Sequence, residues 1–210
     1  MPTITLPDGS FKTYNSNITP IEIAEDISSS LKKSAVIAKV NGDYWDIGRE
    51  ISKDCSVSIL KKGDDETLEV LRHDCAHVLA EAVLEIYPET QVTIGPVIEN
   101  GFYYDFFRET PFTSEDLIAI EKRMHEIVNR NEKIIRKVWS RDDAIKFYEE
   151  KNEPFKVELI NDIPPDQELS FYDQGQFTDL CRGPHLRTTQ DTGHSFKLMS
   201  VAGAYWRGDS

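Results

Sequence analysis

Residues 71–83, LRHDCAHVLAEAV, form the centre of a long helical pattern that is apolar on two sides. One side is an ordinary core stripe of a helix predicted over residues 66–86. Its members are Leu68, Leu71, Cys75, Val78, Leu79, Ala82 and Ile86. At about 100° per residue, His73 and His77 fall on roughly the opposite side, among Val70, Ala80 and Leu84 rather than among charges. We therefore predict a helix that is covered on two faces, with both imidazoles pointing into the second.

On the N-terminal side of this helix, residues 1–62 predict a small β-grasp domain. The alternation around Pro7-Asp8-Gly9 is typical of a β-hairpin. A helix capped by Thr19 follows, and residues 35–47 and 56–62 predict further strands. A charged, glycine-containing linker then leads into the long helix.

On the C-terminal side, residues 63–210 mix helices and strands and form a second, larger domain, so the fold class is α+β. The predicted elements are a hairpin over 93–106 with Asn100-Gly101 at its turn, helices over 114–131 and 141–150, and strands over 134–140, 170–180 and 194–201. The last residues contain Trp206 and end without a closing element, which favours a fragment of a longer protein.

Composition narrows the possible functions. The formal net charge is −13, which argues against a protein that holds nucleic acid through a broad basic surface. The three cysteines make a poor disulfide framework, so we expect a reducing, cytoplasmic location. We find no apolar run long enough to span a bilayer, and we expect no membrane association.

Two spaced pairs carry the chemistry. His73 and His77 are four residues apart, as are Cys181 and His185. Three imidazoles and a thiol are the donor set of a tetrahedral zinc site. The metalloprotease pattern is absent, because Asp74 follows the first histidine where that pattern has a glutamate. A structural zinc clip and an open, water-binding hydrolytic site both remain.

Asp179 favours the hydrolytic site. It stands two residues before Cys181, so an extended strand puts both side chains on one face. An acid, a thiol and three imidazoles exceed what a structural clip needs, and they suit a site that holds and deprotonates water.

These motifs, with IGPVIENGFYYDF and ITLPDGS…VNGDYWDI, resemble the N-terminal half of bacterial-type threonyl-tRNA synthetases. Residues 1–62 look like the TGS domain of that family. Residues 63–210 look like its editing domain, including the SAD-type subdomain near the C-terminus, and end near the YWRGD that precedes the ligase core. The resemblance covers essentially the whole chain.

The resemblance implies hydrolysis of the ester of seryl-tRNA(Thr). A threonine-binding synthetic site rejects serine weakly, because one absent methyl group is worth only about 1–3 kcal/mol. The editing site must then accept serine and exclude the extra methyl of threonine by shape. The implied partners are the 3′-CCA end of the mischarged tRNA and the rest of the synthetase, which is expected to be a homodimer, whereas the fragment could be a monomer.

The resemblance also assigns roles to individual residues. It implies catalytic roles for His73, His77, Asp179, Cys181 and His185, and for Lys156 as the family's catalytic lysine. Asp179 and Tyr104 match an acidic and an aromatic residue of the pocket. Gly95 and Pro96 would let the backbone approach the terminal adenosine, and Arg182 would contact substrate.

The resemblance further implies that this fragment requires no metal. The ATP site and the zinc of the full enzyme belong to a catalytic core that we expect the fragment to lack. Zinc at His73, His77, Cys181 and His185 stays open as an alternative.

Two other functions stay open. One is a hydrolase of the alanyl type that acts on mischarged tRNA in trans, against which the TGS-like region argues. The other is a non-enzymatic binding protein in which the four residues clip a zinc ion for stability.

Overall fold

The computed structural model describes residues 1–203 and has the mixed α+β fold expected from the sequence. It divides into two compact units. The first contains residues 1–71 and also 183–187, and the second contains the rest. Within the described part of the chain, no helix combines the length and apolar character that crossing a membrane requires.

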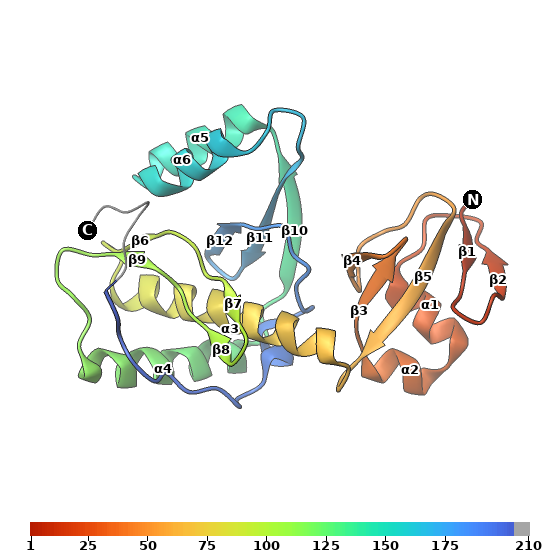
Figure 1. Cartoon of the computed structure of the whole chain (residues 1–210), viewed down its shortest axis with the longest axis horizontal. Helices are drawn as coiled ribbons and strands as arrows, with labels where there is room; N and C mark the ends of the chain where they lie inside the picture. The colour runs from red at the N-terminus through yellow and green to blue at the C-terminus, as the bar shows by residue number, and fades with distance from the viewer. Residues whose placement is uncertain (204–210) are drawn as a thin grey trace. The chain divides into compact units, whose positions relative to one another are not determined.

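The first unit is built on a five-stranded sheet in the order β2-β1-β5-β3-β4, in which β1 and β5 run parallel. Two helices follow one another beside this sheet (Figure 1). The elements are β1 (Thr3–Thr5), β2 (Phe11–Thr13), α1 (Pro20–Ile27), α2 (Ser29–Ser34), β3 (Ala35–Val40), β4 (Asp43–Asp46) and β5 (Cys55–Lys61). Thr19 caps α1 through a capping box with Glu22, as the sequence predicts for that residue. The predicted hairpin, helix and strand pairs appear in the predicted order, and α2 is a second helix that the sequence did not predict.

The long helix is α3 (Asp65–Ile86), close to the predicted 66–86. It is covered on two faces as expected, since Ala76, Val78 and Ala80 are all fully buried. Two acidic residues of the helix are buried as well, with Asp74 0% and Glu81 2% exposed. The helix therefore runs through the interior with carboxyl groups inside.

The second unit packs two small hairpins, a three-stranded sheet and three further helices with α3. The hairpins pair β6 with β9 and β7 with β8, and the sheet has the order β10-β11-β12. The elements are β6 (Gln91–Val92), β7 (Val97–Ile98), β8 (Gly101–Phe102), β9 (Phe106–Phe107), α4 (Ser114–Arg130), β10 (Ile134–Trp139), α5 (Arg141–Glu150), α6 (Pro154–Asp162), β11 (Leu169–Gln174), β12 (Phe177–Leu180) and a 3₁₀ turn, Thr189–Thr192. The turn between β7 and β8 is Glu99-Asn100, one residue before the predicted Asn100-Gly101, because Gly101 pairs with Ile98 as the first residue of β8.

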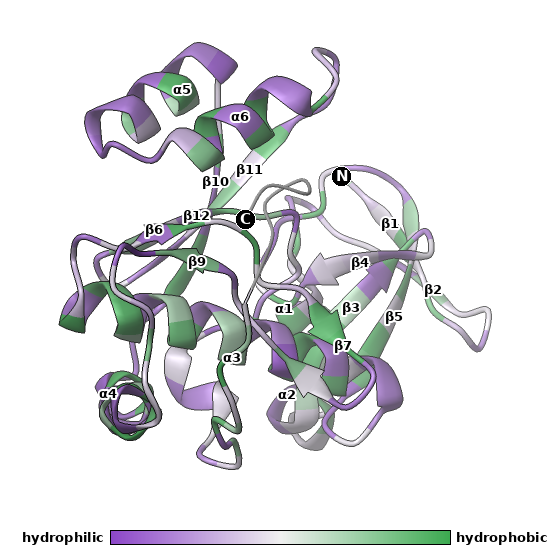
Figure 2. Ribbon diagram, turned by 60° about the vertical axis from the view of Figure 1, so that its left-hand side comes forward, coloured by the Kyte–Doolittle hydropathy of each residue, from purple (hydrophilic) through white to green (hydrophobic). Residues whose placement is uncertain are grey.

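Helix α6 was not predicted from the sequence. It lies beside α5, and both helices alternate hydrophobic and hydrophilic residues along their length (Figure 2). Their hydrophobic residues join a core with β11 that includes Tyr148, Ile160 and Phe171. This core fixes the direction in which α6 presents its side chains.

The prediction of a strand over residues 194–201 is wrong, because these residues form no strand in the structure. The segment binds α4 through side chains instead: His194 Nδ1 lies 2.9 Å from His125 Nδ1, and Lys197 pairs with Glu121. Glu121 also accepts the backbone N–H of Leu198 at 2.8 Å. A backbone donor used in this way is not available for a strand ladder. The YWRGD motif and Trp206 lie outside the described residues.

Candidate active site

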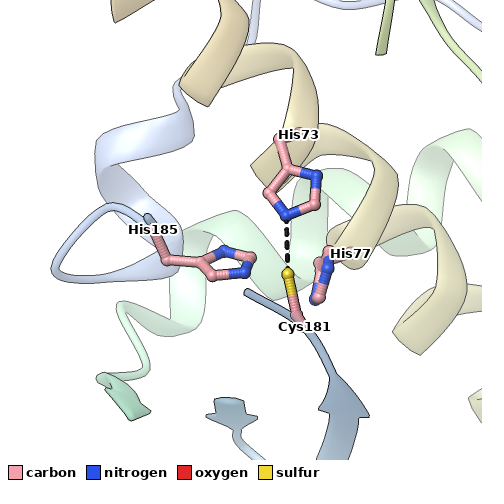
Figure 3. Close-up of side chains that lie close together, drawn as sticks. All are labelled: His73, His77, Cys181 and His185. Carbon is pink, nitrogen blue, oxygen red and sulfur yellow. Dashed lines mark hydrogen bonds between the residues drawn. The ribbon is translucent and has the colours of Figure 1, made fainter. Parts of the chain in front are cut away.

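The structure brings the four predicted donors together. His73 and His77 come from successive turns of α3, Cys181 directly follows β12, and His185 follows the Gly183-Pro184 turn. One ligand atom from each lies within 4.8 Å of the others. Figure 3 shows the four side chains converging on one another. His73 Nε2 is 3.0 Å from the Sγ of Cys181, and the two α3 rings meet edge to face with centroids 4.7 Å apart. His77 and His185 are buried.

This donor set can hold a metal ion. Nitrogen and sulfur ligands in a group of four are the preferred surroundings of zinc. In a tetrahedral zinc site, a nitrogen and a sulfur ligand lie roughly 3.6 Å apart. The His73–Cys181 contact of 3.0 Å is closer than that and is that of a direct hydrogen bond. The arrangement therefore fits zinc by chemistry, with a small outward shift of one side chain.

A second cluster lies beside these four residues. Lys156 of α6 donates to Asp179 Oδ1 on β12 and, at 3.3 Å, to the hydroxyl of Tyr104. Tyr104 donates to the other oxygen of Asp179 at 2.7 Å. His77 Nε2 is 3.9 Å from that same oxygen, so the two clusters are continuous. Lys156 and Asp179 are 2% and 3% exposed.

The hydrogen bonds of Tyr104 follow from its surroundings. Burial raises the pKa of its phenol well above the ordinary value, and the negative charge of Asp179 raises it further. The hydroxyl therefore keeps its proton near neutral pH, donating to Asp179 and accepting from Lys156.

The structure places the remaining predicted residues at the edge of these clusters. Gly95 lies against the face of Tyr104: a Cβ added to it would stand 2.3 Å from the ring. Pro96 follows Gly95 and is half-buried. Arg182 follows Cys181 and is exposed. The predicted contacts of these three residues with a bound nucleotide stay predictions.

Sequence reasoning missed Glu153. This residue is 8% exposed, and its Oε2 accepts the backbone N–H of Val92 at 3.1 Å. Burial raises the pKa of its carboxyl to about 7, against the lowering effects of that hydrogen bond and of Lys156. The available signal was Glu153-Pro154, since proline favours the first position of a helix and so places this carboxyl three residues before Lys156.

Comparison with known proteins identifies the class of protein. Residues 2–61 match the TGS domain family, a β-grasp type, which confirms the fold expected for the first unit. Residues 169–210 match the family described as the threonyl and alanyl tRNA synthetase second additional domain. The chain thus combines two domains of aminoacyl-tRNA synthetases, one of them of the editing type.

The particular family follows from similar whole proteins. The chain is 59% identical over 209 residues to the threonine–tRNA ligase of Gluconobacter oxydans, covering 100% of the chain and 32% of that protein. It is 56% identical to the ligase of Gluconacetobacter diazotrophicus, covering 100% of the chain and 33% of that protein, and 55% identical to that of Rickettsia bellii, covering 99% and 32%. Over its whole length the chain therefore matches an N-terminal fragment of threonine–tRNA ligases, and it spans about a third of the length of these relatives.

Proposed function

We propose that this chain is the editing part of a threonyl-tRNA synthetase and hydrolyses the ester of seryl-tRNA(Thr). Within the longer enzyme it would receive the 3′-CCA end of a mischarged tRNA, while other regions hold the tRNA body and ligate threonine with ATP. We expect that enzyme to act in the cytoplasm as a homodimer. The observation that carries the proposal is the buried Lys156, bonded to Asp179 and Tyr104 beside a group of histidines.

The reaction needs a water molecule, a base and a stabilised oxyanion. The water oxygen attacks the ester carbonyl carbon while one of the histidines, His73 or His77, takes a proton from it. The bond from that carbon to the ribose oxygen then breaks, and the ribose oxygen leaves with a proton. Serine and a tRNA with a free terminal hydroxyl are the products, and no external oxidant or reductant is required.

Lys156 suits the task of oxyanion stabiliser. A buried ammonium group acts in surroundings of low dielectric constant, where it stabilises developing negative charge strongly. Asp179 and Tyr104 hold it in place before substrate arrives, so little reorganisation is needed during the reaction.

Asp179 does more than recognise the substrate. Each of its oxygens already accepts one hydrogen bond, from Lys156 and from Tyr104. A carboxylate can accept about four, so one further donor such as the seryl amine can still bind. We propose that Asp179 first orients Lys156 and then uses a remaining lone pair for the seryl amine or hydroxyl.

The test compares seryl-tRNA(Thr) with threonyl-tRNA(Thr) and seryl-tRNA(Ala) as substrates. We expect deacylation of seryl-tRNA(Thr) alone, with Lys156→Ala and His73→Ala reducing the rate by about 10²-fold or more. Lys146→Ala is the matched control, because Lys146 lies exposed on α5. Wild-type rates in either site variant would rule out the corresponding role, and preference for seryl-tRNA(Ala) would favour the alanyl type.

A metal-dependent site is the second candidate, favoured by the four donor atoms within 4.8 Å. His73, His77, Cys181 and His185 would hold a zinc ion, and such an ion supplies Lewis acidity toward an ester or a water. Metal analysis before and after chelation, followed by deacylation and thermal unfolding, separates the possibilities. Activity and stability that survive complete metal removal would exclude this candidate. Zinc-dependent stability without any deacylation would favour a zinc-clipped binding protein.

A further inference from the structure

Glu153 lies in the turn between α5 and α6, and its side chain contacts the β6 strand. It is the residue before α6 and lines a cavity of about 180 Å³. The other lining residues include Glu81, Tyr148, Lys151 and Phe177. A carboxyl group buried at such a site is costly unless its interactions compensate.

The side chain of Glu153 does not cap its own helix. A residue in this position commonly accepts an N–H of the first helical turn, but Glu153 makes no such side-chain bond. Its carboxylate reaches across to the N–H of Val92, while its backbone carbonyl accepts the N–H of Lys156 at 3.1 Å. One residue thus bonds the β6 strand with its side chain and the lysine-bearing turn with its main chain.

The β6 strand is also the support of Tyr104. Val92 pairs with Phe106 of β9, and the N–H of Asp105 donates to the carbonyl of Ile94 at 2.8 Å. These bonds hold the segment that carries Tyr104, directly before β9, with Gly95 against the tyrosine ring. A shift between α6 and β6 would therefore change the separation of Lys156 Nζ from the Tyr104 hydroxyl, now 3.3 Å.

The charges that face Glu153 connect it to the same cluster. Lys156 and Lys151 favour its ionised form, and Asp179 opposes it. Glu81 and Glu85, which line the same cavity, are the other acidic groups beside it. With its pKa near 7, the carboxyl changes charge within the physiological range.

We propose that Glu153 is a positioning residue whose carboxylate braces α6 against β6 and thereby holds Lys156 against Tyr104 and Asp179. Its catalytic consequence rests on the proposed deacylation. The brace itself is a statement about structure and can be tested without a substrate.

The experiment compares Glu153→Ala, which removes the acceptor, with Glu153→Gln, which keeps an acceptor oxygen but no charge. In single-turnover deacylation of seryl-tRNA(Thr) we expect Glu153→Ala to lower the rate constant about tenfold with an unchanged KM, as the loss of one buried hydrogen bond implies. Glu153→Gln should stay within about threefold of the wild type across the pH range, because its amide oxygen can still accept the Val92 N–H. Glu149→Gln, the same change at an exposed site of α5, should keep the wild-type rate constant.

Two structural measurements test the bracing contact of Glu153 independently of deacylation. Exchange of the Val92 amide hydrogen, followed by NMR, should quicken in Glu153→Ala and stay slow in Glu153→Gln. Acetylation of Lys156 by acetic anhydride should rise in the alanine variant alone. If wild-type protein shows no deacylation, the proposed function fails while these two measurements still decide the brace. Unchanged Val92 exchange in Glu153→Ala, or equal rate losses in both variants, would overturn it. Should Glu153→Ala not fold, faster Val92 exchange in Glu153→Gln than in the wild type would overturn it as well.

Discussion

Gly95 has no room for a side chain, because the ring of Tyr104 occupies the space where a Cβ would stand. The nearest ring carbons would lie 2.3 and 2.7 Å from an added Cβ, well inside contact distance. The ring is held from its other end by hydrogen bonds to Asp179 and Lys156. A methyl group at residue 95 must therefore displace either the Gly95 backbone or the Tyr104 hydroxyl.

We predict that Gly95→Ala destabilises the protein by about 1–3 kcal/mol through this overpacking and weakens the Tyr104–Asp179 hydrogen bond. Urea unfolding measures the first effect, and ultraviolet titration of the tyrosines measures the second. Gly101→Ala is the matched control, because nothing lies within 4 Å of its added Cβ. A Gly95→Ala protein as stable as the control variant would contradict the close approach.

At this scale the sequence predicts some site residues and not others. His73 and His77 could be found because a four-residue interval on one helix is local information. The burial of Lys156 depends on Tyr104 and Asp179, which lie 52 and 23 residues away in sequence. In EPFKVEL the lysine has the pattern of a solvated surface residue, so only the family resemblance indicated it.

Helix α3 departs from a simple amphipathic pattern. Its apolar stripe follows from residue spacing, but the burial of Glu81 does not. Gln174 of β11 donates to Glu81 at 2.6 Å across 93 residues of sequence. The absence of a strand at 194–201 has the same explanation, because this segment bonds to Glu121 and His125 of α4 instead of to another strand. Long-range side-chain partners override local preference in both cases.

We predict that Glu81→Gln stabilises the protein at alkaline pH. Burial raises the pKa of Glu81 to about 8, so the unfolded chain loses this proton near its ordinary pKa of 4.5, before the folded chain does. The free energy of unfolding therefore falls as pH rises from about 4.5 to 8, by on the order of 4–5 kcal/mol, and glutamine removes that loss. Urea unfolding at pH 5, 7 and 9 measures it.

Glu85, four residues further along α3, provides the opposite control. Arg130 and Arg123 lower the pKa of its carboxyl, so its charge stabilises the fold above its ordinary pKa and that contribution is lost in acid. Glu85→Gln should consequently destabilise the protein at neutral pH and gain nothing at pH 9. Parallel behaviour of the two variants would contradict the raised pKa of Glu81.

At the scale of the whole molecule, the first unit has a hydrophobic core of its own. The buried members of that core lie between Ile4 and Val57, and the partly buried residues packed against them extend only to Ile59. Residues 183–187 group with this unit but contribute no member to the core cluster. The β-grasp arrangement could be predicted from turn and strand patterns because each pairing, apart from β1 with β5, joins segments close in sequence.

We predict that residues 1–64 alone fold cooperatively, which would support the proposed division after residue 62. A domain of this length buries little surface, so we expect a free energy of unfolding of only about 2–5 kcal/mol. Ile23→Ala, a change at a residue 1% exposed, should cost about 2–5 kcal/mol and leave the fragment largely unfolded. Ile27→Ala on the same helix, at a residue 48% exposed, should change the stability by less than about 1 kcal/mol. Circular dichroism during urea unfolding measures all three proteins. A gradual loss of signal in the wild-type fragment, without a cooperative transition, would mean that this core needs the rest of the chain to form.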